Sequence, residues 1–115
     1  MSSQPRVARL DLLTASLDGE AVVDRVQVTR VELAASQTVP LHRHPCPVVG
    51  CVLSGSIRFQ IAGKPECLLG PGDGFFEPAL AEIAHFDNAS DHEPAVFVAF
   101  YLLASGETTL IEMLS

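Results

Sequence analysis

Apolar and polar residues alternate along much of this chain with the period of two that is typical of β-strands. The segment 56–61 is apolar at every second position, and Val26 and Val28 alternate with polar neighbours in the segment 21–33. The segment 95–103 is a continuous apolar run rich in β-branched and aromatic residues, which indicates a buried strand. Shorter strands are predicted at Val7–Leu13, Thr38–Leu41, Val48–Leu53, Glu66–Leu69, Gly74–Glu77, Ile83–Phe86 and Thr109–Met113.

Residues that favour turns separate these segments at short intervals. Ser54 and Gly55 lie between two strand-like segments, as in a tight hairpin, and the glycine cluster at 70–74 excludes a helix there. Many short strands at this spacing predict an all-β protein, either a sandwich or a small barrel. No repeat, low-complexity tract or linker divides the chain, so a single domain is expected over residues 1–115.

Composition excludes several classes of function. The chain has 7 basic and 14 acidic residues, and the basic residues are scattered along it. Because no basic stripe is present to neutralise phosphates, we expect no binding to nucleic acid or to an anionic membrane surface. The longest apolar run, Ala95–Ala104, has about half the ~20 residues that a membrane-spanning helix needs, and the N-terminal segment lacks the pattern of a secretory signal. The three cysteines, without a Cys-x-x-Cys spacing, fit a cytoplasmic protein.

The spacing of two histidines is the most direct indication of chemistry. His42 and His44 are two residues apart, so on a strand both imidazoles point to the same face, whereas Arg43 points away. Such a pair can bind one divalent ion of Fe, Mn, Ni, Cu or Zn. Alone, however, a His-x-His pair is more often two exposed histidines at a strand end. Of the other two histidines, His85 lies on a strand-like segment and His92 in a polar loop.

The region Ser36–Asn88 resembles the two motifs of a small single-domain cupin with an RmlC-like jelly roll. In that family the first motif is Gly, five residues, His-x-His, three or four residues, Glu, six residues and Gly. The second is Gly, five residues, Pro, one residue, Gly, two residues, His, three residues and Asn. The segments CVLSGSIRFQIAG and GPGDGFFEP are very similar to the family's central hairpin and to the approach to its second motif. The resemblance implies a jelly-roll barrel, in which family members bind a metal through three histidines and the glutamate.

The chain departs from both motifs at positions that concern the metal. Val48 occupies the position of the glutamate, and a branched hydrocarbon cannot act as a ligand. In the second motif Leu80 replaces the second glycine, and Ile83 stands where the histidine is expected. The available histidine, His85, lies two residues later.

Two interpretations of His85 remain open. A shift of two residues preserves the face of a side chain on a strand, so His85 faces the barrel interior if the extra residues of the segment 78–82 bulge out in the turn. If the strand starts in the same register, His85 lies about 7 Å further along it and misses the metal. On the first interpretation the expected ligands are His42, His44 and His85, with Glu77 as a candidate replacement carboxylate or general base and Cys46 as a candidate thiolate ligand or redox-sensitive residue.

These residues predict a protein that binds a divalent transition metal and a small molecule inside the barrel. The first hypothesis is a dioxygenase-like or isomerase-like metalloenzyme, because three imidazoles leave coordination positions open for a substrate. The alternative is a non-catalytic small-molecule-binding or sensing protein with a metal-free site, which Val48, Leu80 and Ile83 favour. The family resemblance and the many apolar strands for a chain of 115 residues also predict a homodimer.

Overall fold

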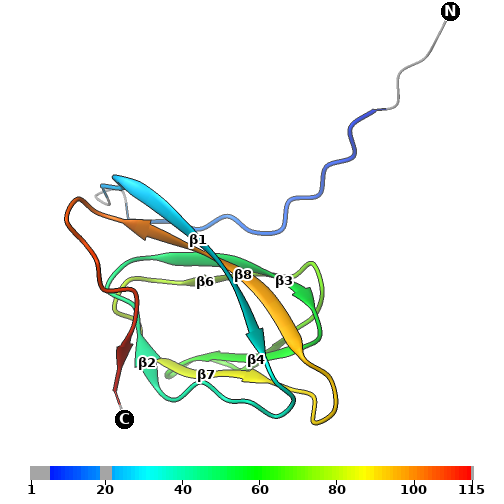
Figure 1. The fold of residues 1–115 in the computed structure, drawn as a ribbon. Helices are drawn as coiled ribbons and strands as arrows, with labels where there is room; N and C mark the ends of the chain where they lie inside the picture. The colour runs from blue at the N-terminus through cyan, green and yellow to red at the C-terminus, as the bar shows by residue number, and fades with distance from the viewer. Residues whose placement is uncertain (1–5, 19–21, 115) are drawn as a thin grey trace, which may run out of the picture.

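A computed structural model of the protein describes residues 6–18 and 22–114, and within them it contains strands and no helix. The strands form two antiparallel sheets that lie one above the other (Figure 1). The first sheet has the order β1 (Arg25–Leu33), β8 (Ala95–Leu103), β3 (Val48–Ser54) and β6 (Gly74–Glu77). The second has the order β5 (Cys67–Leu69), β4 (Ile57–Ile61), β7 (Ile83–Asn88), β2 (His42–Arg43) and β9 (Glu112–Met113). Neighbouring strands that are distant in sequence confirm the predicted all-β jelly roll.

An apolar core fills the space between the two sheets. Alternate residues of the strands point inward, as the period of two predicted, and four phenylalanine rings meet at the centre. The centroids of neighbouring rings are 4.8 to 6.0 Å apart, and the rings are tilted or perpendicular to each other. Such contacts contribute about 0.5–1.5 kcal/mol each beyond the burial of area. The rings belong to Phe59, Phe75, Phe86 and Phe97.

One glycine allows this aromatic packing. Gly50 lies on β3 beneath the ring of Phe75, and a Cβ atom at this position would collide with that ring and with the carbonyl oxygen of Val98. The collision with the backbone cannot be relieved by a side-chain rotation. We therefore attribute the presence of glycine here to close packing and not to an unusual backbone angle.

Two of the predicted strands are absent from the described residues. Val7–Leu13 forms no strand, because the segment runs along the outside of the first sheet and then away from it, where it finds no strand to pair with (Figure 1). Thr38–Leu41 also forms no strand and instead leads into the short β2.

Within the described residues no helix is long and apolar enough to cross a membrane.

Candidate metal centre

Three buried side chains converge between the sheets. His42 lies on β2, His44 follows directly after that strand, and Glu77 is the last residue of β6. They are 3%, 5% and 3% exposed, respectively. The Glu77 Oε2 atom is 2.9 Å from His44 Nε2 and 3.8 Å from His42 Nε2, and one ligand atom of each residue lies within 4.8 Å of the others. We call these three residues the His-His-Glu cluster.

Backbone carbonyls fix the orientation of both imidazole rings. His42 Nδ1 is 2.8 Å from the carbonyl oxygen of Pro40, and His44 Nδ1 is 2.6 Å from that of Leu110. Because a carbonyl oxygen only accepts, each Nδ1 carries a proton and donates it. In the neutral rings both Nε2 atoms therefore present lone pairs toward Glu77. Metal-binding histidines are typically held by such outer hydrogen bonds.

The buried carboxylate has an unsatisfied oxygen. Glu77 Oε2 has no hydrogen-bond donor among the described residues while His44 is neutral, because the ring proton of His44 is then on Nδ1 and its Nε2 atom, 2.9 Å away, carries none. A buried carboxylate oxygen without a partner is unfavourable, and such groups in native proteins usually bind an ion, a water molecule or a proton. Two imidazole nitrogens and one carboxylate oxygen are also donors that divalent transition metals accept. The residues of the His-His-Glu cluster thus fit a metal ion.

The two imidazoles differ in how strongly they hold a proton. Burial lowers the pKa of His42 below the usual 6.5, although the Pro40 carbonyl and Glu77 oppose this effect. Burial also acts to lower the pKa of His44, but the Glu77 carboxylate and the Leu110 carbonyl outweigh it, and the net pKa is raised. In the metal-free protein, His44 is therefore the ring that more readily takes a second proton.

The carboxylate of the cluster comes from a different strand than the family motif implies. Val48 stands at the motif position, is 1% exposed and lines the same cavity as the cluster. In the antiparallel pair β3–β6, Val48 lies directly opposite Glu77, so both side chains point to the same face. The sequence identified Glu77 as a candidate replacement carboxylate, and the structure places it beside the histidine pair.

A bulge in β7 determines which way His85 points. Gln60 of β4 pairs with His85, whereas the next residue, Ile61, pairs with Ile83. Ala84 is therefore an extra residue with no partner on β4. Residues two apart on a regular strand point to the same face of the sheet, but the residues on the two sides of such an extra residue point to opposite faces. Parity along the strand consequently does not carry over from Ile83 to His85.

The structure separates His85 from the His-His-Glu cluster. Ile83 pairs with His42 and is fully buried, so it occupies the inward position where the second motif has its histidine. His85 lies on the outer side of the sheet, where its side chain is 35% exposed and its Nδ1 atom is 3.0 Å from Asp87 Oδ2. The structure therefore departs from the interpretation in which His85 faces the barrel interior, and Ile83 keeps the register of the motif's histidine. His92 lies in an exposed loop, as expected.

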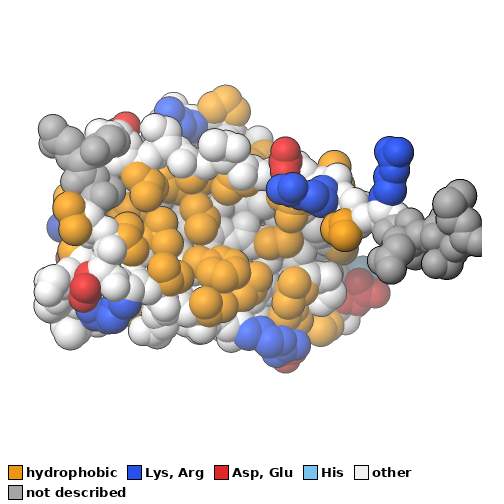
Figure 2. All heavy atoms as spheres, turned by 90° about the horizontal axis from the view of Figure 1, so that it is seen from above, with side chains coloured by type: hydrophobic (Ala, Val, Ile, Leu, Met, Phe, Trp, Pro, Cys, Tyr) orange, Lys and Arg blue, Asp and Glu red, His pale blue; other side chains and the backbone are white. Residues whose placement is uncertain are grey.

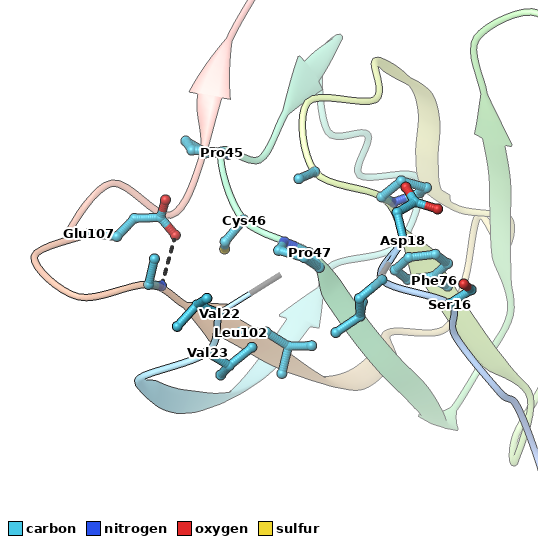
Figure 3. Close-up of a pocket in the computed structure, with 14 residues that line it drawn as sticks. Ser16, Asp18, Val22, Val23, Pro45, Cys46, Pro47, Phe76, Leu102 and Glu107 are labelled. Atoms are coloured by element: carbon cyan, nitrogen blue, oxygen red, sulfur yellow. Dashed lines mark hydrogen bonds between the residues drawn. The ribbon is translucent and has the colours of Figure 1, made fainter. Parts of the chain in front are cut away.

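Cys46 lines another cavity and not the one beside the cluster. This second cavity has a volume of about 280 Å³, and Cys46 lies in its wall between Pro45 and Pro47 (Figure 3). Burial raises the pKa of the Cys46 thiol, and the nearby Glu107 carboxylate adds to the increase. A thiol in these surroundings stays protonated at neutral pH, so the surroundings of Cys46 do not favour a thiolate ligand.

The cavity beside the cluster has a volume of about 210 Å³. It lies between the two sheets, and the three cluster residues form one part of its wall. Tyr101 lies near His44, with ring centroids 5.7 Å apart, and burial raises the pKa of its hydroxyl. The other residues of the wall are Val31, Val39, Val48, Phe75, Phe86, Phe97, Ala99 and Ile111.

Comparisons with known proteins agree with this fold. A family model described as a cupin domain matches residues 29–101, a range that includes the whole His-His-Glu cluster. A dimethylsulfoniopropionate lyase from Ruegeria pomeroyi is 33% identical over 61 residues, which are 53% of this chain and 30% of that protein. The chain thus matches less than a third of the length of this relative.

Solved structures resemble the chain over most of its length. The crystal structure of a dimethylsulfoniopropionate lyase from Ruegeria pomeroyi matches with a TM-score of 0.66 at 23% identity. The matched region covers 78% of this chain and 43% of the lyase chain. A cupin-like protein from Thermotoga maritima has a TM-score of 0.63 at 25% identity, covering 77% and 64%. An oxalate oxidase in complex with glycolate has a TM-score of 0.62 at 24% identity, covering 77% and 46%.

Proposed function

The chain belongs to the cupin domain family, and from this premise we propose that it binds one divalent transition metal through His42, His44 and Glu77. The observation that carries the proposal is the buried Glu77 oxygen without a hydrogen bond, which faces two oriented Nε2 atoms. We further propose that a small molecule occupies the adjoining cavity. Fe, Mn, Ni, Cu and Zn all accept these donors.

Two imidazoles and one carboxylate with open positions favour a dioxygenase-like reaction over an isomerase-like one. Non-haem iron oxygenases use this set of donors. When bound, the metal supplies Lewis-acid or oxygen-activating chemistry. The chain's own residues hold the site in place: the Pro40 and Leu110 carbonyls orient the rings, and Glu77 offsets part of the positive charge. The apolar wall excludes water from the reacting molecule.

A non-catalytic binding protein without a metal is the competing function. It is favoured by the hydrocarbon side chains of Val48 and Ile83, which stand where the family motifs have a glutamate and a histidine. In that case the proton on His44 and the Glu77 carboxylate would form a buried ion pair, with no need for a cation. Metal content therefore distinguishes the two functions directly.

The test is the metal content of the purified protein after removal of metals and reloading with cobalt(II). We expect one cobalt ion per chain in the wild type and a loss of most of it in the variants His42→Ala and Glu77→Ala. His85→Ala is the matched control, because it removes an imidazole outside the cluster, and it should keep the metal. Substoichiometric cobalt in the wild type, or retention in Glu77→Ala, would overturn the proposed ligands.

We also propose a homodimer formed through the outer face of the first sheet. Figure 2 shows hydrophobic side chains gathered on this face, and Val26 and Val28 of β1 are 51% and 57% exposed there. The segment 6–13 adds Val7 and Leu10, which are 86% and 83% exposed and have no cover within the described residues. A second copy would cover both surfaces. Light scattering of the wild type should give twice the mass of one chain. The variant Val28→Arg should shift the measured mass toward that of the monomer. A monomeric wild type would contradict the proposed dimer.

A cytoplasmic location remains part of the proposal. The cysteines Cys46, Cys51 and Cys67 are free, as expected for a reducing compartment. Fractionation of cells that express the chain with a reporter group tests the location, and recovery outside the cytoplasm would contradict it.

A further inference from the structure

We propose that the cavity beside the His-His-Glu cluster selects small ligands with a single metal-binding donor group and an uncharged apolar remainder, and that it disfavours dicarboxylates. This inference rests on the proposed function, because the donor group needs a metal at the cluster. It goes further by assigning the class of ligand. It also separates this chain from the oxalate oxidase that it resembles in fold, whose named substrate is a dicarboxylate.

The wall of the cavity offers almost no polar partners. Besides the cluster, the only polar side chain among the described residues that line it is that of Tyr101. The remaining wall consists of aliphatic and aromatic side chains, and the ring of Phe75 and that of Phe97 are each at most 7% exposed. A second charged group on a ligand would therefore face hydrocarbon. Burying an unpaired charge in such surroundings is strongly unfavourable.

No lysine or arginine among the described residues lines this cavity. Two arginines of the five-stranded sheet, Arg43 on β2 and Arg58 on β4, lie outside this cavity and are already paired. Arg43 Nε is 3.0 Å from Glu112 Oε2, and Arg58 Nε is 2.6 Å from Glu66 Oε1. The Glu77 carboxylate adds negative charge to the interior. Once Glu77 and the ligand's first carboxylate offset the two positive charges of a bound metal, the cavity has no further cation to pair with a second carboxylate.

Hydrocarbon on the ligand is favoured by the same wall. Each methylene buried against apolar side chains strengthens binding by about fourfold, as long as the cavity has room. The volume of about 210 Å³ provides this room for a short chain. The way in which affinity changes with the length of the ligand's hydrocarbon chain, and with a second charge on the ligand, therefore reports on the cavity wall and not on the metal.

The experiment compares three carboxylates on the cobalt-loaded protein. Propionate and butyrate differ by one methylene, and succinate is butyrate with its terminal methyl replaced by a carboxylate. The probe is the visible spectrum of cobalt, titrated with each compound. We expect butyrate to bind about fourfold more tightly than propionate and succinate at least about tenfold more weakly than butyrate. Succinate binding as tightly as butyrate, or no effect of chain length, overturns the inference.

A variant at the cavity wall makes the test independent of the metal's own preferences. Ile111 lines the cavity and is 41% exposed, so Ile111→Arg adds a cation there without disturbing the core. It should raise the affinity for succinate relative to butyrate at least about tenfold. The matched control is Leu53→Arg, because Leu53 is 51% exposed and does not line the cavity.

The outcomes separate this inference from the proposed function. A protein that takes up no cobalt refutes the metal site, and the ligand class falls with it. A protein that takes up cobalt but prefers succinate keeps the metal site and refutes only the ligand class. Equal ratios of succinate to butyrate affinity in Ile111→Arg and Leu53→Arg would also refute it.

Discussion

Val48 and Glu77 face each other across the antiparallel pair β3–β6, with their side chains on the same face of the sheet. Directly opposite residues in such a pair have Cβ atoms about 4.5–5.5 Å apart. A carboxylate on either strand can therefore reach the same region of the cavity. The chain has a hydrocarbon at the position of the motif's glutamate and a carboxylate on the adjacent strand, so the carboxylate of the site is retained, although Ile83 replaces the third histidine.

The first prediction exchanges these two residues. Glu77→Val alone should abolish cobalt binding, because it removes the only carboxylate of the cluster. Adding Val48→Glu should restore at least part of the binding, since the new carboxylate enters the same space from the opposite strand. Metal content and the cobalt spectrum are the measurements. If the double variant binds no more cobalt than Glu77→Val, the cross-strand equivalence is wrong.

The second prediction adds a third imidazole at the motif position. Ile83 is fully buried and pairs with His42, so Ile83→His should place a ring next to the cluster and tighten metal binding. Without metal, the same variant should be less stable by about 1–3 kcal/mol, because a polar ring replaces core hydrocarbon. Urea denaturation with and without cobalt measures both effects. Ala84→His is the control at the bulge and should leave cobalt affinity unchanged.

The third prediction concerns pH and the metal-free protein. The folded pKa of His44 is raised above 6.5, so the folded state binds this proton more tightly than the unfolded chain does. The resulting stability is fully present below about pH 6.5 and is lost as the pH rises through the folded pKa. His42 has a lowered folded pKa and acts in the opposite direction, because the unfolded chain holds this proton more tightly near pH 6.5. A comparison with a variant that keeps His42 cancels this contribution.

Urea denaturation of the metal-free protein at a series of pH values from 6.5 upward measures this effect. The wild type should lose stability over this range relative to His44→Gln, which has no proton to lose. With cobalt bound, the trend should reverse, because the metal requires a neutral ring. Parallel pH curves for the wild type and His44→Gln would contradict the raised pKa.

The fourth prediction concerns the reactivity of the three cysteines. Cys46 is 1% exposed and its thiol has a raised pKa because of burial, whereas Cys67 is exposed on the short strand β5. A thiol-specific reagent near neutral pH should therefore modify Cys67 first and Cys46 only on unfolding. Peptide mass spectrometry after short labelling identifies the order. Early modification of Cys46 would mean that its cavity is open to solvent.

Much of the fold could be predicted because it depends on local patterns. The alternation in 56–61 and the apolar run 95–103 became β4 and β8 with bounds close to those expected. The inward direction of His42 follows from the same period of two. In contrast, Val7–Leu13 has the composition of a strand but pairs with no strand in the described part of the chain, and pairing is a property of the whole sheet.

The site could be predicted only in part for a similar reason. The histidine pair and Glu77 were identified from their spacing and position near a turn. The direction of His85 depends on the unpaired Ala84, and a bulge becomes visible only when β7 is aligned with β4, more than twenty residues earlier in the chain. The motif count did contain one signal, because it placed Ile83 at the histidine position, and the structure pairs Ile83 with His42.

The His-His-Glu cluster also has a mechanical meaning. Its histidines come from β2 and the residues after it, in the five-stranded sheet, and its carboxylate comes from β6 in the four-stranded sheet. An ion held by all three residues would cross-link the two sheets. Loading would then slow the separation of the layers, and the backbone amides of β2 and β6 would exchange with deuterium more slowly than those of the remote strand β5.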